Sequence, residues 1–367
     1  MSALPNRAEH VGSLLRPREL KDAFRAHSEG KLDDRGLRAV QDRAIRAAVA
    51  LQEDAGLGSI TDGEFRRLAW STGFVWALDG LDPRDSLFEF RDDSGDVIRW
   101  QTCHAARPIR RTRGITLEEF EFVRHLTARD VKVTMPAPSF LHFFRGRDCA
   151  DPAVYPDLAA FWQDLVAVYR AEIADLVRRG ATYLQIDEVP LAMLCDDEVR
   201  ERVRARGEDP DELVGTYVDA VNRAIAERPA SMTVGMHLCR GNLRGHWMAS
   251  GGYEAIAERV FNEVRVDAFF LEYDTARAGD FSPLRFVPQD KRVVLGLVST
   301  KTPALESHDS LMRRLDEAAR FVALERLGIS PQCGFASTIG GNPLTEEHER
   351  AKLRRVVEVA ERVWGSA

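Results

Sequence analysis

Short apolar runs alternate with long amphipathic stretches along almost the whole chain, and this alternation limits the folds it can adopt. Eight runs read as strands, at 8–13, 58–61, 131–136, 182–187, 232–237, 268–273, 293–298 and 329–333. Helical stretches lie at 33–56, 157–179, 211–227, 252–262, 308–327 and 344–363. Several strand runs are continuously apolar, as expected of parallel strands covered on both faces. The pattern predicts an α/β fold, a (β/α)8 TIM barrel forming one domain over residues 1–367.

The strongest alternative is an open doubly wound sheet. Such sheets often carry a glycine-rich phosphate loop directly after a strand, with the pattern GxGxxG or GxxxxGK(S/T). Neither motif follows any of the predicted strands. The barrel is therefore the favoured fold.

One segment interrupts the alternation of strands and helices. Residues 83–128 contain FEFRDDSGDVIRW and ITLEEFEFVRHL, with a turn signal at Ser94-Gly95. Partial two-residue alternation on both sides of such a turn is typical of a β-hairpin. We expect a hairpin insertion between the second and third strands, extending over the barrel mouth.

Charge and cysteine usage exclude several classes of partner. The net charge of −7 provides no basic field for nucleic acid or an anionic membrane. No apolar stretch reaches the roughly 18 residues of a membrane span. The N-terminal sequence MSALPNRAEHVG has no signal-peptide pattern. The 5 cysteines are odd in number and scattered along the chain, which does not suit a disulfide framework, so we expect reduced thiols in the cytoplasm.

Polar side chains gather where the predicted strands end. In barrels of this kind the active site lies at the carboxyl ends of the strands. These ends carry, in chain order, Gly12-Ser13, Asp62-Gly63-Glu64, Pro136-Ala137-Pro138-Ser139, Asp187-Glu188, His237 with Cys239, Glu272, Ser299-Thr300-Lys301, and Cys333-Gly334. Chance would scatter such residues along strands and helices as well. Their convergence predicts an enzyme.

Four of these residues are of types that bind a soft or borderline metal ion. His237 and Cys239 are two apart on a strand and so share one face. Glu272 and Cys333 end neighbouring strands. Thiolate and imidazole ligands favour Zn²⁺ over Mg²⁺ or Ca²⁺. A His-x-Cys pair alone is weak evidence, since free cysteines are often buried hydrophobes. Together, ligands drawn from separate strands predict catalytic zinc.

Seven motifs, in order along the chain, resemble one known family. They are HVGSLLRP, ITDGEFRR, YLQIDEVPLA, HLCRGN, FLEYD, VVLGLVSTKTPALE and SPQCGF. They resemble the catalytic barrel of cobalamin-independent methionine synthase, and most closely the short single-domain members of that superfamily. The resemblance runs from about residue 8 to residue 340. It implies zinc held by His237, Cys239, Glu272 and Cys333, and the amino acid part of a homocysteine-like thiol held by Gly12, Ser13, Glu64 and Asp187.

The chemistry that the resemblance implies is S-alkylation of a zinc-bound thiol. We expect methyl transfer to homocysteine or a similar thiol, from 5-methyltetrahydrofolate or another donor, as in methionine biosynthesis. Two alternatives stay open. One is alkylation by an epoxide, as in epoxyalkane:coenzyme M transferases. The other is dependence on a partner protein that carries the methyl group, such as a corrinoid carrier. The sequence does not predict the oligomeric state.

Simpler roles compete for several of these residues. Asp187 could cap a helix, Glu64 could belong to a plain turn, and Ser13 could simply begin a loop. His10 is predicted as a catalytic, proton-handling group together with Asp187, although a satisfied core histidine fits equally well. Trp70, Trp76 and Phe140 could wall the pocket or belong to the core. The stretch MPAPSFLHFF lacks the tryptophan that the family places after the third strand, which leaves the methyl donor open.

Overall fold

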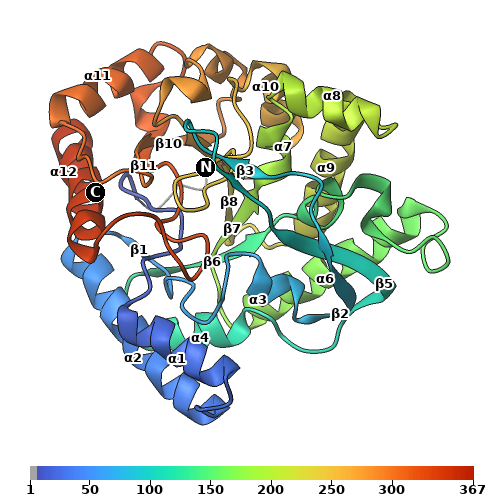
Figure 1. Ribbon diagram of the computed structural model, residues 1–367. Coiled ribbons are helices and arrows are strands. Elements are labelled where there is room, and N and C mark those ends of the chain that lie inside the picture. The colour runs from blue at the N-terminus through green and yellow to red at the C-terminus, as the bar shows by residue number, and fades with distance from the viewer. Residues whose placement is uncertain (1–5) are drawn as a thin grey trace.

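A computed structural model describes residues 6–367, and a parallel sheet lies at its centre (Figure 1). The sheet has seven strands in the order β1-β6-β7-β8-β9-β10-β11. All its neighbouring pairs are parallel. The strands are β1 Ser59–Ile60, β6 Asp130–Pro136, β7 Tyr183–Glu188, β8 Thr233–Leu238, β9 Ala268–Glu272, β10 Arg292–Val298 and β11 Leu327–Pro331. The structure therefore confirms a parallel α/β fold.

Helices cover the outside of this sheet (Figure 1). The α-helices of residues 6–367 are α1 Arg18–Ser28, α2 Asp34–Asp54, α3 Thr72–Val75, α4 Leu117–Arg124, α5 Phe140–Phe143, α6 Leu158–Arg178, α7 Val189–Met193, α8 Asp197–Ala205, α9 Pro210–Ile225, α10 Glu254–Glu263, α11 His308–Ala318 and α12 Glu346–Trp364. Aspartate side chains cap the first turns of α2, α6 and α9. Each predicted helical stretch contains a helix, although the one expected over 308–327 ends at Ala318.

The prediction of a strand over residues 8–13 was wrong, because this segment is not a regular strand. It forms a single parallel bridge, between Ala8 and Ile329 of β11. On its other side, Leu14 N donates to Gly63 O at 3.1 Å, just beyond β1. The segment thus lies between β11 and β1, where an eighth strand was expected. The eight strands that were predicted are therefore seven strands, and an irregular segment takes the place of the eighth.

Side chains from inside the sheet explain this irregularity. The carbonyl groups of three consecutive residues accept hydrogen bonds from side chains, which replace the bonds of a strand ladder. The pairs are His10 O with Lys132 Nζ, Val11 O with Gln185 Nε2, and Gly12 O with Thr61 Oγ1. Gly12 also has a φ of +139°, which a strand residue does not adopt.

The insertion contains the predicted hairpin, but the hairpin begins and ends earlier in the chain than the predicted range of 83–128. Strand β2 Leu78–Asp85 pairs antiparallel with β5 Gln101–Arg111, and the tip carries the short pair β3 Phe90–Arg91 and β4 Val97–Ile98. The second half of the expected hairpin is instead helix α4, because the buried Phe120 and Val123 are spaced for one helical face. The tip is hydrogen-bonded to the loop after β8. Arg91 N donates to Trp247 O, and Trp247 N donates to Arg91 O.

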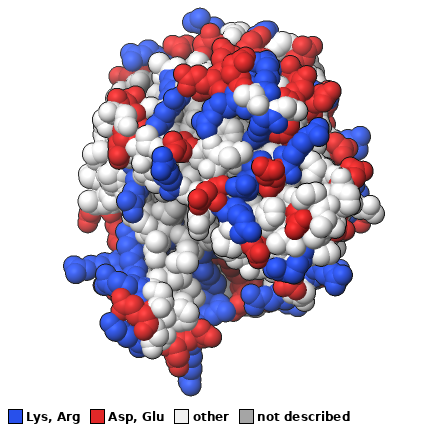
Figure 2. All heavy atoms as spheres, turned by 45° about the vertical axis from the view of Figure 1, so that its right-hand side comes forward, with Lys and Arg blue, Asp and Glu red and all other residues white. Residues whose placement is uncertain are grey.

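Basic and acidic side chains are interspersed on the surface. On the face shown in Figure 2, lysine and arginine do not gather into one basic patch. This distribution is consistent with the net charge of −7. Within residues 6–367, no helix combines the length and apolar character needed to cross a bilayer.

Candidate zinc and thiol-binding site

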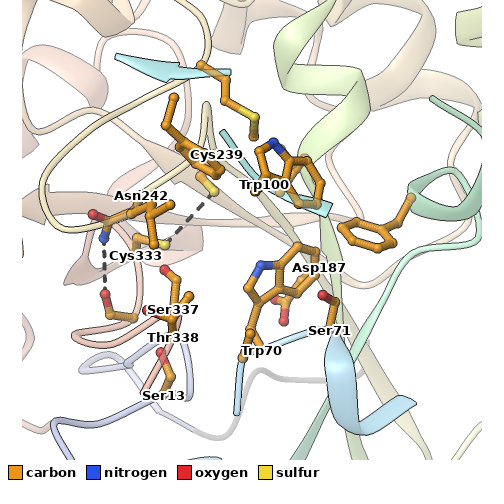
Figure 3. Close-up of a pocket in the computed structure, with 18 of the residues that line it drawn as sticks. Ser13, Trp70, Ser71, Trp100, Asp187, Cys239, Asn242, Cys333, Ser337 and Thr338 are labelled. Carbon is orange, nitrogen blue, oxygen red and sulfur yellow. Dashed lines mark hydrogen bonds between the residues drawn. The ribbon is translucent and has the colours of Figure 1, made fainter. Parts of the chain in front are cut away.

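The end of β8 and the loops after β8 and β11 bring an imidazole and two thiols together. His237 lies near the end of β8, Cys239 follows that strand, and Cys333 lies two residues beyond β11. The Sγ atoms of Cys239 and Cys333 are 3.9 Å apart (Figure 3). One ligand atom from each of the three residues lies within 4.8 Å of the others, and all three residues are buried. The structure thus brings together three of the four predicted zinc ligands.

Asn242 ties the loop after β8 to the loop that carries Cys333. Its Nδ2 donates to Thr300 Oγ1 at 3.0 Å and to Gly334 O at 3.1 Å. The second bond fixes the residue next to Cys333 against the loop of Cys239. Asn242 was not predicted from the sequence, because its role depends on two loops that are distant along the chain.

The three residues offer a donor set that suits zinc. Neither ring nitrogen of His237 has a hydrogen-bond partner among the residues that the structure describes. Cys333 shares a hydrogen bond with Cys239 and lies near the imidazole of His237. These two interactions hold the pKa of Cys333 well below its ordinary value. A buried imidazole without a partner beside an acidic thiol is the arrangement expected of a zinc site. We conclude that these residues fit the ion.

Glu272, the fourth predicted ligand, lies outside this group. Its Oε2 accepts from Arg240 N at 2.8 Å, and its Oε1 accepts from Arg277 Nη2 at 2.8 Å and Lys301 Nζ at 3.1 Å. Burial favours the protonated form, but the surrounding cations, led by Lys301, hold the pKa of Glu272 well below its ordinary value. Its ligation of zinc stays a prediction.

A cavity of about 210 Å³ opens beside the three ligands. Ser13, Glu64 and Asp187 line it together with His237, Cys239 and Cys333. The strand register aligns Asp187 of β7 with His237 of β8, which explains why the carboxylate lies next to the imidazole. Burial raises the pKa of Asp187 to about 7. Three of the predicted substrate-binding residues therefore share one cavity with the predicted metal ligands.

Glu64 is held in a strained conformation at the cavity wall. Its φ is +61°, which is uncommon for a residue with a side chain. Oε1 accepts from Thr134 Oγ1 at 2.8 Å, whereas the buried Oε2 has no partner among the described residues. This open acceptor can bind a ligand's donor group. Gly12 lies directly behind it, since a Cβ there would be 2.7 Å from Thr134 Cγ2 and 3.5 Å from Glu64 Oε1.

His10 does not line the cavity. Its Nε2 lies 3.2 Å from Ser59 O, and its Nδ1 has no partner among the described residues. Burial, with a contribution from Lys132, lowers the pKa of His10 well below its ordinary value. The catalytic role predicted for His10 therefore has no direct contact with the cavity to support it.

An aromatic wall, made of Trp70, Phe90, Trp100, Phe140 and Phe144, lines part of the cavity. Trp70 and Phe140 were considered as pocket walls in the sequence, and the structure places both there. Trp100 was missed, because it belongs to the insertion and reaches the cavity only through the fold of the hairpin. The third candidate, Trp76, is 43% exposed and lies outside the cavity.

The sequence profile of the family described as cobalamin-independent synthase, catalytic domain, matches residues 8–362. The chain belongs to this family. Relatives of this cobalamin-independent synthase domain include the protein YxjH of Bacillus subtilis, 40% identical over 98% of this chain and 95% of the relative. A methionine synthase of Pyrococcus abyssi is 28% identical over 89% of this chain and 85% of the relative.

Among solved structures, a protein of Listeria monocytogenes assigned as a vitamin-B12 independent methionine synthase is similar along its entire length. It covers 100% of both chains at 33% identity, with a TM-score of 0.78. The family resemblance inferred from the motifs is thereby confirmed. Membership of the cobalamin-independent synthase family implies a methyltransferase that acts on small-molecule thiol and methyl-donor substrates.

Proposed function

We propose that this protein is a zinc-dependent S-methyltransferase that acts on homocysteine or a similar amino acid thiol. The observation that carries the proposal is the single cavity shared by two kinds of group. The cavity is lined by His237, Cys239 and Cys333 and also by Glu64 and Asp187. The first set suits zinc and a sulfur, and the second suits an ammonium group.

His237, Cys239 and Cys333 would hold the zinc ion, with Glu272 as the predicted fourth ligand. A free alkyl thiol with a pKa near 8.5 is only about 3% thiolate at neutral pH. Bound zinc would lower the pKa of the substrate thiol so that its sulfur is a nucleophile at neutral pH. The three ligand residues are buried, and burial strengthens the charge interactions around them.

The chain's own carboxylates would place the substrate and accept its proton. The free Oε2 of Glu64 accepts a hydrogen bond from the ammonium group of the amino acid. Ser13 lines the same cavity and would receive the carboxylate, together with the backbone of Gly12 directly before it in the chain. Asp187, with a pKa of about 7, takes the thiol proton at its carboxylate. His10 would act only indirectly, because it lies outside the cavity.

The charge of the cavity argues against a sulfonated thiol. A sulfonate requires arginine or lysine, as other strongly acidic groups do. Among the described residues that line the cavity there is neither. An amino acid thiol, with its ammonium group, is the better match to Glu64 and Asp187.

The proposal can be tested with a methyl donor that needs no binding site. Zinc-loaded protein is incubated with homocysteine and methyl iodide, and methionine is measured by mass spectrometry. We expect methionine above the uncatalysed rate in the wild type and a loss of at least about 100-fold in Cys239→Ser. The control is Cys195→Ser, a buried cysteine outside the cavity. Equal rates with and without protein would contradict the proposal.

A further inference from the structure

Two buried side chains outside the cavity contact the carboxylate of Glu64. They are Arg67, in the loop after β1, and Thr134 of β6, which are 3% and 2% exposed. Thr134 Oγ1 donates to Glu64 Oε1 at 2.8 Å, and Arg67 Nη1 lies 3.5 Å from the same oxygen. Neither residue is among those that line the cavity. They can therefore act on a ligand only through other residues.

The direction of these hydrogen bonds follows from the chemistry of arginine, which has donors and no acceptor. Arg67 Nη1 donates to Thr134 Oγ1 at 3.1 Å, so the threonine oxygen is the acceptor in that contact. The single hydroxyl hydrogen of Thr134 is then directed to Glu64. A chain of donors thus runs from Arg67 through Thr134 to Oε1 of Glu64, and it leaves Oε2 for a ligand.

Arg67 is itself held by contacts on several sides. Its Nε donates to Glu119 Oε1 of helix α4 at 3.1 Å, and its Nη2 donates to Glu119 Oε2 at 2.5 Å. Nη2 also donates to Thr134 O at 2.9 Å, and Nη1 donates to Trp70 O at 3.3 Å. A planar guanidinium bonded in this way has a fixed orientation. Arg67 can therefore fix the positions of Thr134 and Glu64.

The backbone of Glu64 is held by a second buried guanidinium, that of Arg16. Its Nη2 donates to Glu64 O at 2.8 Å, and its Nη1 donates to Ala336 O at 2.5 Å. Ala336 belongs to the loop that carries Cys333, so Arg16 joins Glu64 to a predicted zinc ligand's loop. The φ of +61° at Glu64 is costly, and it persists where the surroundings support it.

The charge of Arg67 favours the form of Glu64 that a cationic ligand requires. Burial raises the pKa of Glu64, and the positive charge of Arg67 is the foremost of the interactions that oppose this rise. An ammonium group forms a stronger hydrogen bond with an ionised carboxylate than with a neutral acid. Arg67 therefore supports the ammonium-binding role proposed for Glu64.

The polar atoms of this network are paired up to the cavity wall and not beyond it. A network that only stabilised the fold would pair all of its buried polar atoms. Among the side chains of Arg67, Thr134, Glu119 and Glu64, the buried polar atom without a partner among the described residues is Oε2 of Glu64. Glu64 is also the member of the network that lines the cavity.

From these contacts we infer that Arg67 and Thr134 are positioning residues for the amino acid end of the substrate. They orient the carboxylate of Glu64 so that Oε2 is open to the ammonium group, and Glu119 anchors them to helix α4. The inference rests on the proposed function and extends its recognition site to residues that do not touch the ligand. It also gives the insertion a part in recognition of the amino acid, because α4 belongs to it.

The test measures the preference of the site for a thiol with an amino group. Zinc-loaded full-length protein is titrated in a calorimeter with homocysteine and with 4-mercaptobutanoate, which lacks that group. The ratio of the two dissociation constants reports the ammonium site, because the contact of the sulfur is common to both thiols. In Thr134→Val we expect the preference for homocysteine to fall about 10-fold, as for a lost hydrogen bond to a charged group. Arg67→Lys, which keeps the charge but loses the planar fork, should act in the same direction.

Two further variants separate positioning from loss of stability. Thr134→Ser keeps the hydroxyl and should retain the preference of the wild type. The matched control is Thr116→Val, which removes a buried threonine hydroxyl that donates to the buried Glu172 at 2.7 Å, outside the cavity. This control should leave the preference unchanged.

The outcomes distinguish the inference from the proposed function. A wild-type preference in Thr134→Val would overturn the inference and leave the proposed function standing. An equal loss in Thr134→Ser and Thr134→Val would also overturn it, because the hydroxyl would then not be the group that matters. A wild type that does not prefer homocysteine would refute the amino acid thiol as substrate, and the inference with it.

Discussion

The sulfur atoms of Cys239 and Cys333 lie 3.9 Å apart although the residues are 94 positions apart in the sequence. They follow β8 and β11, which are not adjacent in the sheet. Loops must therefore bring the thiols together, and Asn242 bonds one loop to the other. The geometry of the site depends on this connection as much as on the ligands.

Asn242→Ala should weaken zinc binding without removing a ligand. The substitution deletes the hydrogen bonds to Thr300 and Gly334, so Cys333 is no longer fixed against Cys239. Loss of a residue that orients metal ligands typically costs about 10- to 100-fold in affinity. Competition with a chromophoric chelator measures the zinc dissociation constant. Asn222→Ala, at a surface carbonyl contact, is the control. An affinity equal to that of the wild type would contradict the positioning role.

Glu64→Gln should impair recognition of the amino group. The amide keeps the shape of the side chain but loses the charge that pairs with ammonium. We expect KM for homocysteine to rise about 10-fold or more, because a hydrogen bond to a charged group contributes about 1.5–3 kcal/mol to binding. The same variant is assayed with 4-mercaptobutanoate, which lacks the amino group. The preference for homocysteine over this analogue should fall, and an unchanged preference would argue against Glu64 as the ammonium site.

Glu272→Gln should destabilise the protein even when no metal is bound. The carboxylate is fully buried among Arg240, Arg277 and Lys301, and its loss removes the counter-charge of both arginines, while Lys301 keeps Asp274 at 3.0 Å. Breaking a buried pair of this kind costs about 3–5 kcal/mol. Urea unfolding in the presence of a chelator measures the free energy. The exposed pair of Glu254 and Arg285 provides the comparison, where Glu254→Gln should cost less than about 1 kcal/mol. Equal effects of the two substitutions would contradict this account.

Glu349→Gln should change how stability depends on pH. Burial raises the pKa of Glu349 to about 8, while its Oε1 accepts from Leu15 N at 2.9 Å. The folded state holds the proton of the Glu349 carboxyl more tightly than the unfolded state does. The contribution of this group to the free energy of unfolding is therefore complete below about pH 4.3 and is lost as pH rises through 8. The variant keeps the acceptor without the charge. Relative to wild type, it should gain more than about 1.4 kcal/mol of unfolding free energy between pH 5 and pH 9. Parallel pH curves for the two proteins would contradict the prediction.

The parallel strands could be predicted from the sequence because their signal is local. Runs such as AFFL in β9 are apolar, and the polar residues at their ends, here Glu272, fall at one edge of the sheet. This is why His237, Cys239 and Cys333 could be grouped from the sequence alone. The irregular path of residues 8–13 could not be predicted, because it depends on hydrogen bonds from Lys132 and Gln185 on other strands.

The aromatic wall and the contacts of Glu272 could not be predicted from the sequence for a related reason. Trp100 reaches the cavity through the pairing of β2 with β5, and no local pattern marks it as a wall residue. The cations around Glu272 come from three separate loops. Sequence patterns report which face a residue occupies on its own element. They do not report which side chains meet it from elsewhere.

The most direct test of the central claim is the zinc content of the purified protein, measured by plasma mass spectrometry on wild type and Cys333→Ser. We predict about one zinc ion per chain in the wild type and in the Cys195→Ser control, with loss of the ion in Cys333→Ser. A folded Cys333→Ser protein with its full zinc content would contradict the claim. So would a wild type that methylates homocysteine without any bound zinc.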